Sequence, residues 1–278
     1  MDAGCEVLGG EDRLSPELDA SIVSNAAFRE RIFGAVLPSL EADERVRACF
    51  EGGSVAMGRA DEFSDIDLYV VAEPAVHEAI LDEFERALAN AAPLAHTWKV
   101  DPPAFPGVAQ RIYLLRDAPR FFAVDCAVLT AAAAEQFLER ERHGEPRVLF
   151  DRDGTIGAPP LDRARHAARL HARLAQIRAS WPVYRTIVEK ELARGHALDA
   201  IGFYFVGLLR PLLELVGMRY RPERFDYGWR YLHVDLPAKL QRTLQDFAYV
   251  DSPAALGAHL PEIDRLAASL FAELPGQE

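Results

Sequence analysis

The sequence predicts an α+β protein, in which a mixed sheet with flanking helices is followed by an all-helical C-terminal region. Short β-branched runs alternate with helical patterns up to about residue 130, and nearly everything beyond residue 160 has helical periodicity. Glycine, proline and charged residues gather between the two parts, over 144–160, which is typical of a linker. We therefore expect two domains, residues 1–155 and 156–278.

The first domain is expected to alternate helices and strands. Positions Ile80, Leu81, Phe84 and Leu88 form one apolar stripe of a helix. The strand candidates are short apolar runs that end at glycines, prolines or charged turns. In chain order the expected elements are a helix over 16–45, strands over 46–50 and 65–71, a helix over 77–91, and strands over 94–100, 110–115 and 120–129.

The second domain is expected to contain about five helices. Each segment repeats apolar residues every three to four positions, and Pro211 lies inside the third of them, where it should kink the helix. The expected helices cover 161–179, 183–195, 197–217, 237–250 and 253–274.

Charge is unevenly distributed along the chain. The net charge is −12; residues 1–150 hold 14 Lys+Arg and 27 Asp+Glu, giving −13, whereas residues 151–278 hold 17 and 16, giving +1. An acidic first half repels nucleic-acid phosphates and attracts metal ions or a cationic substrate, although most of these charges also suit a plain solvated surface. The composition therefore disfavours a nucleic-acid partner.

The sequence also indicates in which cellular compartment the protein is expected and whether it is expected to contact a membrane. The N-terminal segment is acidic without an apolar core, which argues against a signal peptide. The longest apolar run, 201–209, is far shorter than the roughly 20 residues that span a bilayer. Cys5, Cys49 and Cys126 are scattered and form no Cys-x-x-Cys pair. We expect reduced thiols, a cytoplasmic location and no membrane partner.

Two carboxylates open the second predicted strand. Asp65 and Asp67 are two residues apart, so they project from the same face of a strand. Like charges this close raise each other's pKa unless a cation lies between them, and Mg²⁺ held by carboxylates and phosphates is the usual partner. Ser64, just before the pair, is expected to cap the turn rather than to do chemistry.

Residues around this pair indicate the kind of reaction in which the cation would take part. Gly52-Gly53 would let backbone N–H groups approach an anion, and Ser54 adds a hydroxyl at an expected helix N-terminus. Asp125 stands alone among apolar residues of a later strand, where a charge is expensive unless paired or metal-bound. A phosphate cradle beside carboxylates favours phosphoryl or nucleotidyl transfer. An acidic turn with a hydrogen-bonded buried aspartate is the alternative.

This ordered set resembles the DNA polymerase beta nucleotidyltransferase superfamily. The resemblance covers about residues 30–150 through motifs and 160–250 through architecture alone, where a helical second domain after the nucleotidyltransferase core is similar to aminoglycoside and lincosamide nucleotidyltransferases. It implies that Gly53 and Ser54 hold the triphosphate of ATP and that Asp65 and Asp67 bind two Mg²⁺ ions. Asp125 would complete the second metal site or act as general base on the acceptor hydroxyl.

The helical domain offers weaker candidates. The resemblance implies that a lysine such as Lys190 reaches the nucleotide phosphates, whereas a solvated lysine beside acidic neighbours is the alternative. Residues 219–237 are rich in Tyr, Trp and Arg, and Arg224 and Arg230 are the expected nucleotide-binding residues there. The same segment could instead be a loop packed by its own aromatic rings.

The predicted function is that of an adenylyltransferase-like enzyme. It would move AMP from ATP to a hydroxyl of a small molecule, such as an aminoglycoside-type antibiotic, and release pyrophosphate. A protein adenylyltransferase of the antitoxin type and a nucleotide-binding protein without turnover are the alternatives, and the sequence leaves a homodimer open.

Overall fold

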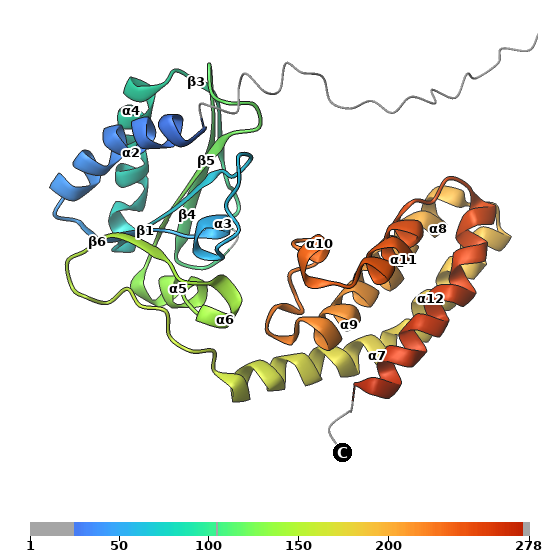
Figure 1. Ribbon diagram of the computed structural model, residues 1–278. Helices are drawn as coiled ribbons and strands as arrows, with labels where there is room; N and C mark the ends of the chain where they lie inside the picture. The colour runs from blue at the N-terminus through green and yellow to red at the C-terminus, as the bar shows by residue number, and fades with distance from the viewer. Residues whose placement is uncertain (1–24, 104, 275–278) are drawn as a thin grey trace, which may run out of the picture. The chain divides into compact units, whose positions relative to one another are not determined.

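The structure, a computed structural model, describes residues 25–103 and 105–274 of the chain. The chain divides into two compact units, Met1–Pro160 and Leu161–Glu278 (Figure 1). The sequence placed this division between residues 155 and 156, in the same proline-containing stretch. The predicted fold class is confirmed, because a mixed sheet with flanking helices precedes an all-helical unit.

The first unit is built on a six-stranded sheet in the order β3-β4-β5-β2-β1-β6. Strands β2 and β5 are parallel, and each of the other neighbouring pairs is antiparallel. All five predicted strands are present, with ends that differ by up to three residues. The strands are β1 (Val46–Glu51), β2 (Ile66–Ala72), β3 (Leu94–Lys99), β4 (Val108–Leu115), β5 (Ala123–Leu129) and β6 (Arg147–Asp151).

Strand β6 corrects the prediction of a linker over 144–160. Residues 147–151 pair antiparallel with β1 at the edge of the sheet. None of the five is fully buried, so the segment lacks the apolar pattern of an inner strand. An edge strand needs only one hydrogen-bonding neighbour, and charged residues are common there.

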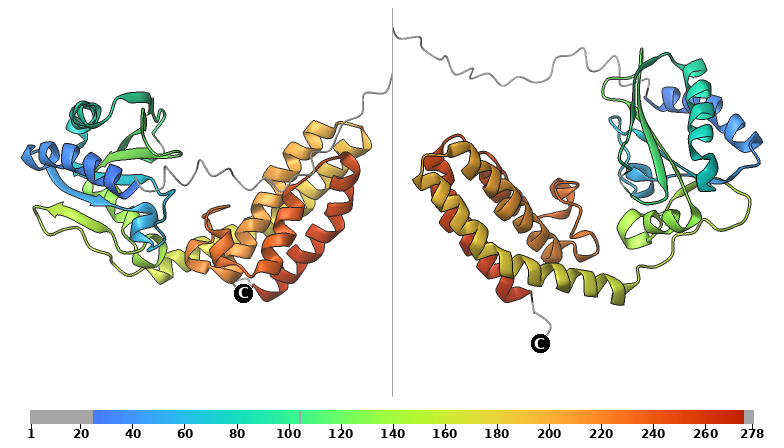
Figure 2. Two further views of the ribbon diagram at one scale, coloured as in Figure 1. Left: turned by 45° about the horizontal axis from the view of Figure 1, so that its top comes forward. Right: turned by 180° about the vertical axis from the view of Figure 1, so that it is seen from behind.

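Helices cover the two faces of this sheet unequally (Figures 1 and 2). The long helices α2 (Asn25–Ala42) and α4 (His77–Ala91) pack on one face, and their apolar residues form one core with β1, β2, β4 and β5. The residues of α2 lie within the predicted helix over 16–45, whose first nine residues are outside the described part. Helix α4 has the predicted bounds and buries the predicted stripe.

Among the described residues, the other face carries only short elements. Helix α5 (Ala131–Ala134) packs on a second, smaller core that includes Ala48, Phe50 and Leu129. The remaining short elements of this unit are α3 (Gly53–Ala56), η2 (Pro74–Val76), η3 (Glu135–Phe137) and α6 (Arg140–His143). The thin covering leaves room for polar side chains on this face.

The second unit is helical around a core of its own. It contains α7 (Arg163–Ala193), α8 (Ala197–Tyr204), the π-turn η4 (Phe205–Leu209), α9 (Arg210–Tyr220), η5 (Pro222–Arg224), α10 (Leu232–Asp235), α11 (Ala238–Ala248) and α12 (Pro253–Glu273).

Helix α7 corrects the prediction of two helices over 161–179 and 183–195, because it runs through Pro182 without a break. Tertiary contacts hold both sides of the proline. Trp181 Nε1 and Arg185 Nε donate to the two carboxylate oxygens of Asp264 on α12, over 2.9 and 2.7 Å. These contacts offset the backbone hydrogen bond that a proline removes.

Where the sequence predicts a kink at Pro211, the structure has a π-turn that ends two residues before the proline, at Leu209. Widening the helix there relieves the clash between the proline ring and the carbonyl one turn earlier. By length and composition alone the run Ala197–Tyr220 could cross a membrane, with a mean hydropathy of 1.5. Two-thirds of its most apolar window (67%) is buried inside the structure, as in a core helix.

Candidate functional site

The parallel pairing of β2 and β5 sets two of the predicted carboxylates side by side. Asp67 and Asp125 are register partners on these adjacent strands. Their neighbours Ile66 and Leu68 are buried against α2 and α4. Successive side chains of a strand point to opposite faces, so both aspartates project from the face with the short helices. Residues 58 positions apart in sequence thereby meet on one face.

Asp65 lies just before β2, next to this pair. Its Oδ1 accepts a hydrogen bond from the Ala123 N–H over 2.7 Å, at the start of β5. Burial raises the pKa of Asp65; the Ala123 N–H opposes the rise, the charge of Asp67 adds to it, and the charge of Arg29 opposes it. A partly buried carboxylate beside another one is a group that a cation would stabilise.

Gln110 on β4 holds the third carboxylate. Its Nε2 lies 2.8 Å from both Oδ1 and Oδ2 of Asp125. Strand β4 pairs with β5 on the side away from β2, so the amide reaches Asp125 across one strand spacing. Gln110 is not among the site residues predicted from the sequence. Its one sequence signal was a polar residue at the start of the strand predicted over 110–115.

The glycine turn lies directly against Asp67. The Gly52 N–H donates to the Asp67 carbonyl over 2.9 Å. Gly53 has a φ of +56°, and a Cβ on it would stand 1.7 Å from Asp67 Oδ2. A side chain at this position would therefore be strained by the backbone conformation and would require the Asp67 side chain or the turn to move.

Ser54 follows in the single turn of α3. The first N–H groups of any helix have no partner inside the helix, so those at the start of α3 are available to an acceptor. Ser64 caps the next turn as predicted, since its Oγ accepts from the Asp61 N–H over 2.8 Å and donates to Asp61 Oδ1 over 3.0 Å. Gly53, Ser54 and the three aspartates thus all belong to the first unit.

Lys190, Arg224 and Arg230 belong to the second unit, where each is part of a local network. Lys190 Nζ lies 3.3 Å from Glu191 Oε1, and Arg224 Nη2 lies 3.4 Å from Asp235 Oδ1. The Arg230 carbonyl accepts from the buried guanidinium of Arg221.

Arg221 also organises the aromatic-rich segment 219–237. It donates to the Gly228 carbonyl over 2.6 Å and pairs with Asp235 at 3.2 Å. The loop is therefore held by a buried arginine. Neither of the two interpretations of this segment from the sequence included that contact.

A compact group of ionisable side chains also occurs at the end of α7. Within the described ranges, ligand atoms of Glu191, His196 and Asp199 lie within 4.8 Å of one another. The carboxylate oxygens of Asp65, Asp67 and Asp125 do not all lie this close together. Glu191 is already paired with Lys190, Arg194 and His196, so this group is an ion-pair network at a helix end. The carboxylates of Asp65 and Asp125 are instead turned toward the donors of Ala123 and Gln110.

Comparison with known proteins gives structural neighbours only. No protein-family model matches the chain, and no curated protein matches it. An aminoglycoside 6-adenyltransferase from Bacillus subtilis shares 18% identity over 87% of each chain, with a TM-score of 0.36. The GLD-2/RNP-8 complex shares 11% identity over 91% of this chain and 78% of that chain (TM-score 0.34). A protein of H. pylori assigned as a nucleotidyltransferase shares 11% over 94% and 97% (TM-score 0.24). Scores this low leave the interpretation of the site to the residues of this chain.

Proposed function

We propose that the chain is a metal-dependent nucleotidyltransferase that moves a nucleoside monophosphate from a nucleoside triphosphate to a hydroxyl group and releases pyrophosphate. The observation that carries the proposal is the register pairing of Asp67 with Asp125, with Asp65 beside them and Gly53 against the Asp67 carboxylate. An acidic turn with a lone buried aspartate, the alternative from sequence, does not require this pairing on adjacent strands.

The donor set fits divalent cations. Asp65, Asp67 and Asp125 supply hard oxygen ligands of the kind that Mg²⁺ prefers, and burial together with Asp67 raises the pKa of Asp65 in the absence of a cation. When bound, two such ions would neutralise the phosphate charge that develops during transfer. We assign Asp65 and Asp67 to this role.

The other residues would bind and orient the substrates. The N–H groups at the start of α3 and the Ser54 hydroxyl would donate to phosphate oxygens, and the bare Cα of Gly53 lets those oxygens come close. Gln110 would orient the carboxylate of Asp125, which either completes the metal set or accepts the proton of the attacking hydroxyl.

For the substrates we propose ATP and a small, hydroxylated, cationic acceptor of the aminoglycoside kind. The net charge of −13 over residues 1–150 supports a cationic acceptor and opposes a nucleic-acid end. Lys190, Arg224 and Arg230 remain proposed nucleotide-binding residues. We place the protein in the cytoplasm, which the buried free thiols of Cys49 and Cys126 support.

The test is transfer from ATP labelled at the α-phosphate. The full chain is incubated with labelled ATP, Mg²⁺ and a panel of aminoglycosides, and both pyrophosphate and labelled products are followed. We expect a labelled small product and a loss of about 100-fold or more in Asp67→Asn, the size typical of removing a group that stabilises transition-state charge. Asp251→Asn, an exposed aspartate, is the matched control.

A second reaction, in which cell lysate is added with the same labelled ATP, helps to separate the alternatives. Label on protein in a lysate, with no small product, would identify a protein adenylyltransferase instead. Binding of ATP without pyrophosphate release under every acceptor would identify a nucleotide-binding protein without turnover. Undiminished transfer by Asp67→Asn would overturn the proposed site.

A further inference from the structure

Arg29 on α2 reaches the backbone beside the carboxylate site from the opposite face of the sheet. Its Nη1 donates to the Asp65 carbonyl over 2.7 Å and lies 3.3 Å from the Ser64 carbonyl. Its Nη2 donates to Oε1 of Glu51. One guanidinium therefore joins α2, the end of β1 and the residues that enter β2.

Glu51 is the anchor of this contact. It is fully buried (0% exposed) at the end of β1. It is also the register partner of Leu68, which places it on the face with α2 and α4, opposite to Asp67. A buried carboxylate is stable only when it is paired and hydrogen-bonded, so Glu51 fixes the arginines that contact it.

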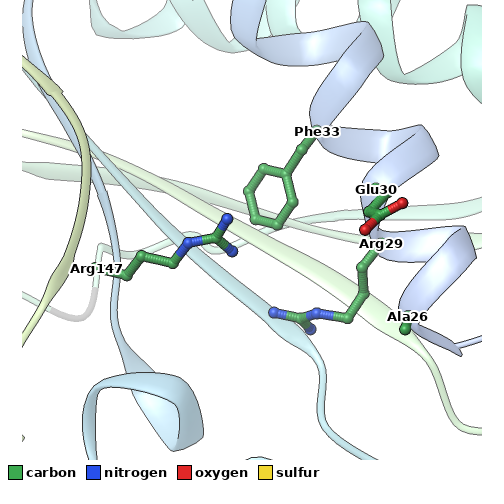
Figure 3. A pocket seen from close by; sticks show the side chains of 5 residues that line it. All are labelled: Ala26, Arg29, Glu30, Phe33 and Arg147. Carbon is green, nitrogen blue, oxygen red and sulfur yellow. The ribbon is translucent and has the colours of Figure 1, made fainter.

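Arg147 on β6 is the second partner of Glu51, with Nη1 3.2 Å from Oε2. Figure 3 shows the guanidinium groups of Arg29 and Arg147 directed toward each other beside Phe33, in a pocket of about 340 Å³ that Ala26 and Glu30 also line. Arg147 is 56% exposed, whereas Arg29 is 16% exposed. Arg29 hydrogen-bonds to the Asp65 carbonyl, whereas Arg147 hydrogen-bonds to Glu51.

The backbone of Asp65 needs such a contact. The pairing of β2 with β5 begins at Ile66 and Val124, so Asp65 lies outside that register. Its carboxylate is held by the Ala123 N–H and its carbonyl by Arg29. Since the carbonyl and the side chain share one Cα, the arginine limits the rotation of the whole residue.

We propose that Arg29, anchored by Glu51, is a positioning residue that holds Asp65 in its metal-binding orientation. The proposal rests on the proposed function, because it takes Asp65 to be a metal ligand. Arg29 acts from the face of the sheet away from Asp67, through the Asp65 backbone.

Arg29→Gln and Arg147→Met make a matched pair for the test. Each removes one of the two cations that contact Glu51, but only Arg29 contacts Asp65. Mn²⁺ affinity is measured without nucleotide, by the electron paramagnetic resonance of free Mn²⁺, and the melting temperature is recorded for each variant. We expect Arg29→Gln to weaken Mn²⁺ binding about tenfold, which corresponds to about 1.4 kcal/mol and to one charge-assisted hydrogen bond. Arg147→Met should bind Mn²⁺ as the natural protein does.

Turnover adds a second readout. Excess Mg²⁺ should restore kcat in Arg29→Gln, because the ligand itself is still present, but not in Asp67→Asn. If Arg29→Gln does not fold, the double variant Arg29→Gln/Glu51→Gln takes its place in the comparison with Arg147→Met. It removes both buried charges together, which destabilises the fold less than removing one partner alone.

Each outcome has one meaning. Equal Mn²⁺ affinity in Arg29→Gln and the natural protein, or equal losses in Arg29→Gln and Arg147→Met, would overturn the positioning role alone, provided that Asp67→Asn has lost the metal. Mn²⁺ binding that Asp67→Asn leaves unchanged would overturn the proposed metal site, and the role of Arg29 with it.

Discussion

Gly53 is a residue at which a side chain would collide with the carboxylate of Asp67. Its positive φ and the 1.7 Å separation between a built Cβ and Asp67 Oδ2 are separate constraints. A left-handed conformation alone costs an ordinary residue about 1–2 kcal/mol. The contact with Asp67 should add to that cost, because either the turn or the carboxylate must move.

Gly53→Ala and Gly58→Ala separate these two constraints. Gly58 has a φ of +64° but nothing within 4 Å of a built Cβ, so it meets only the conformational one. We expect Gly53→Ala to lower the free energy of unfolding by more than Gly58→Ala does, and to weaken Mn²⁺ binding, which Gly58→Ala should leave intact. Urea unfolding and Mn²⁺ titration measure the two effects. Equal destabilisation of both variants would show that the Asp67 contact is not restrictive.

The residues of the site differ in how far the sequence could reveal them. Asp125 could be selected because it interrupts an apolar run, which has a physical cost that local sequence shows. Asp65 and Asp67 could be selected because they form an Asp-x-Asp pair at the start of a predicted strand. Gln110, Arg29 and Glu51 could not be selected. Their partners lie 15 to 96 positions away, and only the packing of strands and helices in the folded chain brings them into contact.

At the scale of elements, Arg111 joins β4 to α4. Its guanidinium lies 2.9 Å from Glu78, 2.7 Å from Asp82 and 3.1 Å from Glu85, all on the same helix. Arg111 is 12% exposed, so water screens these pairs less than it does at the surface. The network therefore fixes the helix that covers the sheet behind the carboxylate site.

Arg111→Met should destabilise the protein by about 1–3 kcal/mol at neutral pH, the range for a broken, partly buried charge network. Arg111 and then Lys99 lower the pKa of Glu78 below its usual 4.5. The stabilisation is therefore complete above pH 4.5 and is lost as the pH falls through the lowered value. Urea unfolding at pH 7 and at pH 3 should show the difference between the natural protein and the variant shrinking in acid. Arg86→Met, at an exposed pair with Glu83, is the control and should change stability little. A difference that is the same at both pH values would contradict the role of the carboxylates.

Two elements were not predicted correctly from the sequence, for opposite reasons. Strand β6 is too polar to be recognised, because an edge strand can satisfy its backbone with one neighbour and leave its side chains in water. Helix α7 was divided at Pro182, because local propensity puts a helix boundary there. Contacts of Trp181 and Arg185 with Asp264, about 80 positions away, override that propensity.

For the whole molecule, the second unit should fold by itself. Its core is made of its own residues, among them Leu174, Ile177 and Trp181 of α7 and Leu212 and Ile263 of later helices. We expect a fragment of residues 161–278 to show helical circular dichroism and one cooperative thermal transition. A fragment of residues 183–278 is the comparison. It lacks Leu174, Ile177 and Trp181, keeps Val188 of the same helix, and should lose cooperativity. Similar melting of both fragments would mean that residues 163–182 of α7 do not hold this unit together.

The sequence by itself determined the fold class, the chain order of most elements and the three carboxylates, because these follow from periodicity and from charges placed in apolar runs. Only the tertiary structure decided that Asp67 and Asp125 are register partners, that Gln110 holds one of them, and that Arg29 holds the backbone of Asp65 from the other face of the sheet. The physical reason is the parallel pairing of β2 with β5. It joins strands that are far apart in sequence, and the contacts across a sheet depend on strand order and register, which local sequence does not specify.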